Sequence, residues 1–261
     1  MSGASAQFRP GLANGAAAVK KTLVMGIVNV TPDSFSDGGK YFSAKEAVRR
    51  AKNLVAEGAD IIDVGGESTR PGAEPVGWEE EWARVEEPLA ELVAALGGKV
   101  LLSIDTYHPE TARRAVELGV KMINCVSGES AAAMIEIARS AHGVQLVLPV
   151  GSRDLVPEEF SDRVYFDPMI GFGTTREEDL AFLKSVPELA ASARVLVGAS
   201  RKRIVKKLTG EKVTGKNLGG NLGIAIWCAM NGAAIVRVHD VRETVQALKV
   251  IAALSGGEES A

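Results

Sequence analysis

Residues 23–65 read LVMGIVNVTPDSFSDGGKYFSAKEAVRRAKNLVAEGADIIDVG and contain the unit that repeats along the chain. Two short apolar runs, at 23–30 and 60–65, enclose an amphipathic stretch at 44–57 that has the apolar spacing of a helix. The apolar runs are continuous rather than alternating, which is typical of parallel strands covered by helices. This stretch therefore predicts a strand, a helix and a second strand parallel to the first.

The same alternation continues to residue 254. Further strands are expected at 99–105, 121–126, 144–150, 163–168, 194–200 and 233–240. Further helices are expected at 79–96, 109–118, 131–140, 177–183, 222–231 and 242–254. Eight strands with intervening helices over about 240 residues predict an α/β fold, a single (β/α)8 TIM barrel. An open doubly wound sheet is disfavoured because no glycine-rich phosphate turn follows Val30.

One unit of the predicted barrel is irregular. The segment GSRDLVPEEFSD (151–162) between the fifth and sixth strands is too short, and too interrupted by proline, for a full covering helix. The fifth helix is therefore expected to be abbreviated. Uncovered strands would expose an apolar patch, so Leu155 and Phe160 are expected to be buried against the outside of these two strands.

The amino-acid composition is that of a globular protein and excludes several other classes. With 46% hydrophobic residues, a net charge of -3, 28 glycines and 2 cysteines, the chain is neither disordered, collagen-like nor a disulfide scaffold. The two cysteines are distant in sequence and suit a reducing cytoplasm. The near-neutral charge and short apolar runs predict no nucleic-acid or membrane partner. We expect a flexible N-terminal tail at 1–20, one barrel domain at 21–255 and a frayed C-terminus at 256–261.

Polar side chains end seven of the eight expected strands. They are Asn29, Asp63, Asp105, Asn124, Asp167, Ser200 with Lys202, and Arg237 with His239. The carboxyl ends of barrel strands face the active-site mouth. Any single one of these residues could be a helix cap or a loop hydrogen bond. Together they predict a site for a polar heterocycle and an anion, since carboxylates pair with amino groups and cations hold phosphates.

Two long loops follow the first two strands. Residues 29–42 and 65–76 are rich in glycine and proline and have defined polar content, which is typical of loops that close over a site. Arg70 lies in the second loop and is placed to meet a charged ligand. The alternative interpretation is that each loop lies on the surface and only connects a strand to a helix.

Six motifs resemble, in order, those of the dihydropteroate synthase family of pterin-binding barrels. They are NVTPDSFSDGG (29–39), ESTRPGA (67–73), SIDT (103–106), DPMIGFG (167–173), SRK (200–202) and RVHDV (237–241). The resemblance implies that the chain joins 6-hydroxymethyl-7,8-dihydropterin diphosphate to p-aminobenzoate. The products would be 7,8-dihydropteroate, a folate precursor, and pyrophosphate. It also implies Mg²⁺ as cofactor and a target for sulfonamides.

The resemblance assigns roles to individual positions. The residues expected to hold the pterin are Asp105, Asn124, Asp167 and Lys202. Those expected to hold the diphosphate are Asn29, Arg237 and His239, with Asn29 also binding the metal. Those expected to shape the p-aminobenzoate pocket are Phe35, Thr69, Arg70, Pro71 and Ser200. Asp105, Lys202 and Arg237 are the expected catalytic residues.

The chain departs from the family pattern around the fourth to sixth strands. Cys125 stands where the family usually has aspartate, LPV (148–150) where it usually has Met-His-Met, and Met169 where it usually has glycine. A non-catalytic or divergent pterin-binding paralogue therefore stays open as an alternative. A methyltetrahydrofolate-binding methyltransferase also stays open, because it resembles this chain in the barrel and in the Asp, Asn and Asp residues that hold the pterin. The helical stretch at 222–231 is apolar nearly all round and suggests packing against a second subunit, hence a homodimer.

Overall fold

The computed structural model describes residues 21–31, 44–67, 74–213 and 215–255. The segments predicted to be a flexible tail (1–20) and a frayed C-terminus (256–261) lie outside the described residues. No helix within these four ranges is both long and apolar enough to cross a bilayer.

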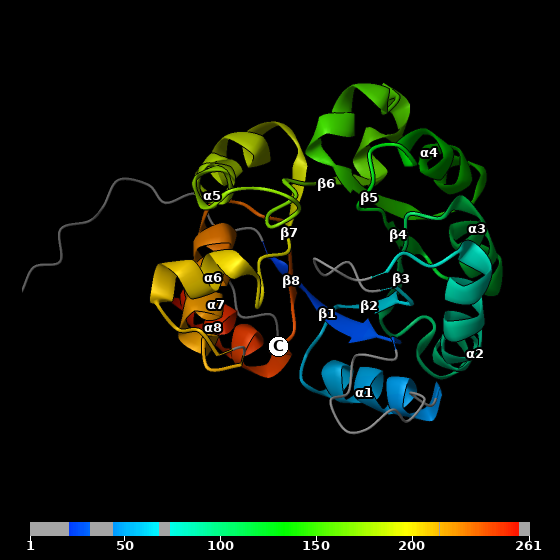
Figure 1. Cartoon of the computed structure of the whole chain (residues 1–261), viewed down its shortest axis with the longest axis horizontal. Coiled ribbons are helices and arrows are strands. Elements are labelled where there is room, and N and C mark those ends of the chain that lie inside the picture. Colours follow the sequence, from blue (N-terminus) through cyan, green and yellow to red (C-terminus); the bar gives the residue numbers. More distant parts are fainter. Residues whose placement is uncertain (1–20, 32–43, 68–73, 214, 256–261) are drawn as a thin grey trace, which may run out of the picture.

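Eight parallel strands close into a barrel in sequence order, and β8 pairs with β1 to complete the ring (Figure 1). The strands are β1 (Leu23–Asn29), β2 (Ile61–Gly65), β3 (Leu101–Asp105), β4 (Met122–Asn124), β5 (Gln145–Pro149), β6 (Val164–Asp167), β7 (Arg194–Val197) and β8 (Ile235–Val238). The predicted TIM barrel is therefore confirmed, with strands shorter than their apolar runs because the runs continue into the connecting loops.

Helices surround the strands on the outside of the barrel (Figure 1). They are α1 (Ala44–Ala56), α2 (Trp78–Leu96), α3 (Pro109–Leu118), α4 (Ala131–Ser140), α5 (Arg176–Ser192), α6 (Arg203–Thr209), α7 (Leu218–Met230) and α8 (Val241–Leu254). The predicted helix at 177–183 is too short, since α5 continues through Pro187 to Ser192. Leu183 and Val186 are buried on its inner face, so packing against the barrel overrides the helix-breaking tendency of proline.

The buried side chains form two clusters separated by the wall of the barrel. The larger cluster fills the layer between the strands and the helices. The smaller cluster closes the inside of the barrel and consists of Met25, Ile61, Met122, Val147, Tyr165, Leu196 and Ile235. These inner residues, one from each of seven strands, form an apolar floor below the carboxyl ends of the strands.

The connection between β5 and β6 contains two short 3₁₀ helices, Val150–Leu155 and Glu158–Arg163, in place of a full α-helix. This confirms the abbreviated fifth helix. Phe160 is 1% exposed and belongs to the outer core, as predicted. The prediction for Leu155 is wrong, because its side chain is 53% exposed. Phe160, with the Arg163 guanidinium 4.4 Å above its ring, covers this flank without Leu155.

Candidate active site

The polar residues at the mouth of the barrel follow from the alternation of side chains along each strand. Residues two apart in a strand point to the same face. Asp63, Asn124, Asp167 and Arg237 each lie two positions beyond a residue of the inner floor: Ile61, Met122, Tyr165 and Ile235. Asn29 and Asp105 lie four positions beyond Met25 and Leu101, which pack in or against the same floor. The apolar floor therefore carries a polar layer from six strands.

A salt-bridge network occupies the centre of this layer. Arg237 Nε donates to Oδ2 of Asp63 over 2.6 Å, and Arg237 Nη2 donates to Oδ2 of Asp105. Burial alone would lower the pKa of Arg237, but Asp105 and Asp63 raise it, so the guanidinium stays charged. Burial raises the pKa of Asp105 to about 7, and Arg237 opposes that shift.

Three acceptor atoms in and beside this network have no hydrogen-bond partner among the described residues: Oδ1 of Asp63, of Asp105 and of Asn124. Asn124 Nδ2 donates to Asp63 Oδ2 over 3.0 Å, which fixes the orientation of the amide. Its Oδ1, and Oδ1 of Asp105, are buried without a hydrogen bond from the described part of the chain. An unpaired buried acceptor is costly, so these two atoms indicate a ligand that brings N–H donors.

Asp167 and Lys202 lie on the next part of the rim. The Asp167 carboxylate accepts a hydrogen bond from the backbone N–H of Met169 over 2.7 Å. Lys202 Nζ donates to the carbonyl oxygen of Ile170 over 2.6 Å and lies 4.2 Å from the centre of the Phe172 ring. Burial raises the pKa of Asp167, and Lys202 opposes that shift. Burial lowers the pKa of Lys202 to about 8, and Asp167 opposes that shift in turn.

The loop after β6 is built for the close approach of Lys202. Gly171 has a φ of +80°, and a Cβ there would lie 2.9 Å from Cδ of Lys202. Met169 has a φ of 64°, in the left-handed region that glycine tolerates best. Met169, which stands where the family usually has glycine, therefore adds a steric cost to the backbone of this loop.

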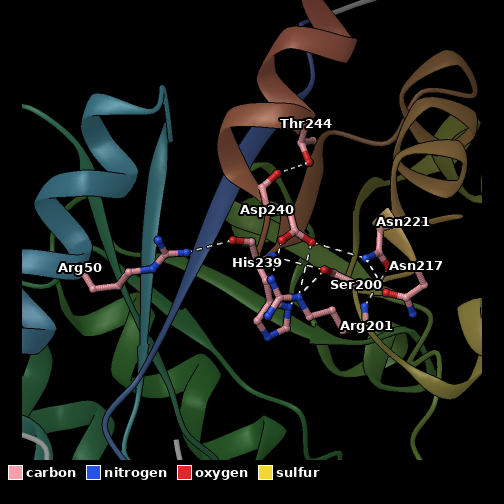
Figure 2. A network of polar contacts seen from close by, with 8 residues as sticks. All are labelled: Arg50, Ser200, Arg201, Asn217, Asn221, His239, Asp240 and Thr244. Carbon is pink, nitrogen blue, oxygen red and sulfur yellow. Dashed lines mark hydrogen bonds and ion pairs between the residues drawn. The ribbon is translucent and has the colours of Figure 1, made fainter. Parts of the chain in front are cut away.

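The loops after β7 and β8 are joined by polar contacts (Figure 2). Ser200 Oγ lies 3.1 Å from Nδ1 of His239 and accepts the backbone N–H of His239 over 3.3 Å. Arg201, at a φ of 60°, pairs with Asp240, and its backbone N–H donates to Oδ1 of Asn221 over 3.0 Å. These contacts fix Ser200 and Arg201, the two residues before Lys202, against the β8 loop.

Asn29 ends β1 with its side chain partly exposed. A Cβ on Gly65 would lie 3.8 Å from Asn29 Oδ1 and 3.5 Å from Asp105 Cβ, so this glycine leaves the space between them open. No group of three or more His, Cys, Asp or Glu in the described ranges could hold a metal ion. One amide oxygen suits only a hard cation whose other ligands are water and substrate phosphates, as is common for Mg²⁺.

Sequence reasoning assigned no role to Asp63, although it lies among the polar strand ends. Its side chain is fully buried and joins Arg237 to Asn124. The signal was an aspartate in the middle of the apolar run IIDVG (61–65), where a buried charge needs a partner. Four predicted residues of the p-aminobenzoate pocket lie outside the described residues: Phe35, Thr69, Arg70 and Pro71.

Cys125, which follows Asn124, is buried, and burial raises the pKa of its thiol to about 11. Its Sγ lies 3.3 Å from the carbonyl oxygen of Ser127. The family usually has an aspartate at the position of Cys125. The neutral thiol found here adds no negative charge beside Asp105. The departure at Cys125 therefore leaves the polar layer at the carboxyl ends of the strands intact.

Comparison with known proteins agrees with this geometry. The chain matches the family of pterin binding enzymes over residues 25–159 and 153–239. It is 38% identical to the dihydropteroate synthase of Neisseria meningitidis serogroup B over 268 residues, which covers 90% of this chain and 93% of that protein.

Two solved structures extend the comparison. A Xanthomonas albilineans dihydropteroate synthase with 4-aminobenzoic acid has a TM-score of 0.82 and 37% identity, covering 90% of this chain and 94% of that one. A Yersinia pestis dihydropteroate synthase with a sulfonamide drug has a TM-score of 0.79 and 30% identity, covering 91% and 95%. With this fold, this polar layer and these relatives, the chain belongs to the dihydropteroate synthase family of pterin-binding enzymes.

Proposed function

We propose that the chain is a dihydropteroate synthase whose polar layer binds the pterin and the diphosphate and whose second loop binds p-aminobenzoate. The enzyme is a transferase that joins 6-hydroxymethyl-7,8-dihydropterin diphosphate to p-aminobenzoate and releases pyrophosphate. The observation that carries the proposal is a pair of unpartnered buried acceptors, Oδ1 of Asp105 and of Asn124, next to the buried carboxyl of Asp167.

The aminopyrimidinone edge of a pterin matches these groups. It offers an exocyclic amino group and a ring N–H, which need carboxylate or amide acceptors. In the proposed complex Asp167, Asn124 and Asp105 accept from the pterin, and Lys202 donates to its acceptor atoms. The apolar floor below, with Tyr165 and Met122, excludes water from one side of the ring system.

Arg237, His239 and Asn29 are proposed to hold the diphosphate. A guanidinium has five N–H donors, and the described contacts of Arg237 with Asp63 and Asp105 use only Nε and Nη2. Asn29 would share Mg²⁺ with the diphosphate oxygens, and the ion would add positive charge beside the leaving group when bound. Arg237 then stabilises the negative charge that develops on the departing pyrophosphate.

The proposed reaction is a displacement at the exocyclic methylene carbon. The C–O bond to the diphosphate breaks with its electron pair leaving on pyrophosphate. The amine nitrogen of p-aminobenzoate forms the new C–N bond and loses one proton, which passes to the departing pyrophosphate or to solvent. Positive charge develops on the pterinylmethyl group, and the Asp105 carboxylate is placed to stabilise it. Lys202 orients the pterin. No covalent intermediate with the protein is required, since positioning and electrostatics lower the barrier.

The p-aminobenzoate pocket is proposed to use Ser200 together with Phe35, Thr69, Arg70 and Pro71. Ser200 is held against His239, so the proposed p-aminobenzoate and diphosphate zones meet at one contact of 3.1 Å. Arg70→Ala should raise the KM for p-aminobenzoate or lower kcat, with pterin diphosphate binding nearly unchanged. Loss of pterin diphosphate binding in calorimetry would contradict the role given to Arg70. A sulfonamide should compete with p-aminobenzoate at this pocket.

A homodimer in the cytoplasm, without nucleic-acid or membrane partners, completes the proposal. The outer face of α7 exposes Trp227 (47%) and Met230 (55%), large apolar side chains of the kind found at subunit interfaces. Sedimentation of the purified protein would test the dimer, and Trp227→Glu with Met230→Glu should convert it to a monomer.

Product analysis tests the activity itself. Purified protein with pterin diphosphate, p-aminobenzoate and Mg²⁺ should form 7,8-dihydropteroate, identified by mass spectrometry, and omission of either substrate should abolish it. Absence of product from protein that still binds pterin diphosphate would favour the non-catalytic paralogue. Methyl transfer from methyltetrahydrofolate would favour the methyltransferase, although the relatives described above are dihydropteroate synthases.

A further inference from the structure

Asp179 is a fully buried carboxylate outside the polar layer, and it contacts the loop after β6. It is the fourth residue of α5. Its Oδ1 accepts the backbone N–H of Gly171 over 2.7 Å and the hydroxyl of Thr174 over 2.5 Å. Side chains of a helix lean toward its N-terminus, so a residue of the first turn can reach the preceding loop. Because a carboxylate is costly to bury, these two contacts indicate a role in the loop.

The start of α5 does not depend on Asp179. The Thr175 hydroxyl accepts the backbone N–H of Glu178 over 3.2 Å, and the Glu178 carboxylate accepts the backbone N–H of Thr175 over 2.6 Å. These reciprocal hydrogen bonds form a complete capping box. The hydrogen bonds of Asp179 therefore serve the loop at 168–174 rather than the helix.

A single peptide unit of this loop connects Asp179 to Lys202. The N–H of Gly171 donates to Asp179, and the carbonyl oxygen of Ile170 accepts from Lys202 Nζ over 2.6 Å. Both groups belong to the Ile170–Gly171 peptide. A trans peptide is planar, with its C=O and N–H pointing in opposite directions, so a fixed N–H also fixes the direction of the carbonyl. A carboxylate that accepts the N–H also polarises the carbonyl and strengthens it as an acceptor.

The same loop shapes the other surroundings of Lys202. The centre of the Phe172 ring lies 4.2 Å from Lys202 Nζ, and Gly171 leaves the space that Cδ of the lysine approaches. An ammonium has three N–H donors, and the contact with Ile170 uses one of them. The remaining donors are those that the proposed pterin complex requires.

We propose that Asp179 is a positioning residue for Lys202, acting through the Ile170–Gly171 peptide and through its negative charge. The carboxylate fixes the N–H of this peptide, and the carbonyl on the other side holds the lysine ammonium for the pterin. The proposal rests on the pterin-orienting function proposed above for Lys202. Asp179 is fully buried and is not itself a ligand of the pterin.

Two variants of Asp179 separate its hydrogen bonds from its charge. Oδ2 of Asp179 has no hydrogen-bond partner among the described residues, so the amide nitrogen of Asp179→Asn can take its place without breaking a contact. The amide oxygen then keeps the bonds to the loop, whereas the charge is lost. Asp179→Leu removes the acceptors as well. Glu177→Gln, at an exposed acid in the same helical turn, is the matched control.

Calorimetry with pterin diphosphate tests the positioning. Asp179→Leu should weaken binding about fivefold, the size of one net hydrogen bond. Asp179→Asn and Glu177→Gln should stay within about twofold of the wild type. In a Lys202→Met background, Asp179→Leu should add no further loss, because its effect passes through Lys202. Unchanged binding in Asp179→Leu, equal weakening by Asn and Leu, or a full additional loss in the Lys202→Met background overturns the proposal.

The titration of Lys202 in the ligand-free protein provides a second readout, which does not require the Leu variant to fold. Burial lowers the pKa of Lys202 to about 8 and Arg237 adds to that shift, whereas Asp167, Asp105 and Asp179 oppose it. Loss of the Asp179 charge should therefore lower this pKa further.

Labelling of lysines with acetic anhydride across a pH series, read by mass spectrometry, measures this midpoint. Asp179→Asn should move the midpoint of Lys202 to lower pH, and Glu177→Gln should not. An unmoved midpoint in Asp179→Asn, or the same shift in both variants, overturns the proposal. If the shift occurs but the wild type binds no pterin diphosphate, the function proposed for the pterin site fails while the link between Asp179 and Lys202 stands.

Discussion

Arg237 Nε and Asp63 Oδ2 lie 2.6 Å apart, and this contact spans β1, which separates β8 from β2 in the barrel. The same guanidinium also reaches Asp105 on β3. Two carboxylates therefore share one cation before any ligand binds. This sharing keeps Arg237 aimed into the barrel mouth, and it lets a substrate donor bind the remaining oxygen of Asp105, Oδ1, without the guanidinium having to move.

The burial of the Asp105 carboxyl predicts a pH dependence of stability. Burial raises the pKa of the Asp105 carboxyl from its ordinary value of 3.8 to about 7 in the folded chain. Between these values the folded state holds more protons than the unfolded state, so stability falls as pH rises. Denaturant unfolding of ligand-free protein at pH 5 and pH 7.5 should show a smaller loss in Asp105→Asn than in the wild type. An equal loss in both proteins would contradict the raised pKa.

Asp167→Asn tests the proposed hydrogen bonds from the pterin to the Asp167 carboxylate. The amide keeps the shape of the carboxylate but turns one acceptor oxygen into a donor, which leaves an unmatched hydrogen bond costing about 1–3 kcal/mol. Pterin affinity measured by calorimetry should fall roughly tenfold or more. Asp162→Asn is the matched control, because Asp162 is exposed and lies just before the same strand. It should bind the pterin with wild-type affinity. Unchanged affinity in Asp167→Asn would remove Asp167 from the site.

Met169→Gly tests the steric cost of the β6 loop. Met169 and Arg201 are the described non-glycine residues with positive φ, at 64° and 60°. Glycine adopts this conformation freely, so Met169→Gly should raise the free energy of unfolding by about 1 kcal/mol. Arg201→Gly removes the pairing with Asp240 as well and should give no gain. Destabilisation by Met169→Gly would show that its side-chain packing outweighs the backbone cost.

Phe160→Ala and Leu155→Ala separate a buried from an exposed residue of one connection. Loss of the Phe160 ring, 1% exposed, should lower the free energy of unfolding by about 3–5 kcal/mol. Leu155→Ala, at a 53% exposed position, should change it by less than about 0.5 kcal/mol. Denaturant titration of both variants checks the difference, and similar values would contradict the burial pattern.

The barrel and most of its polar layer could be predicted because strand alternation and strand ends are local in sequence. Asp167 and Arg237 are examples, since each ends a short apolar run. The partner of Arg237 could not be predicted, because the pairing with Asp63 depends on barrel closure across 174 residues. Leu155 and Phe160 have the same apolar character, and only the path of the two 3₁₀ helices decides which one is buried.

Pyrophosphate release tests the central claim most directly, that this polar layer joins the two substrates. The account predicts release by the wild type only when pterin diphosphate, p-aminobenzoate and Mg²⁺ are all present. Lys202→Met should reduce the rate by roughly 100-fold or more, because Lys202 orients the reacting group. Lys207→Met, on the exposed side of α6, should match the wild type. Equal release from pterin diphosphate alone, or full activity of Lys202→Met, would contradict the account.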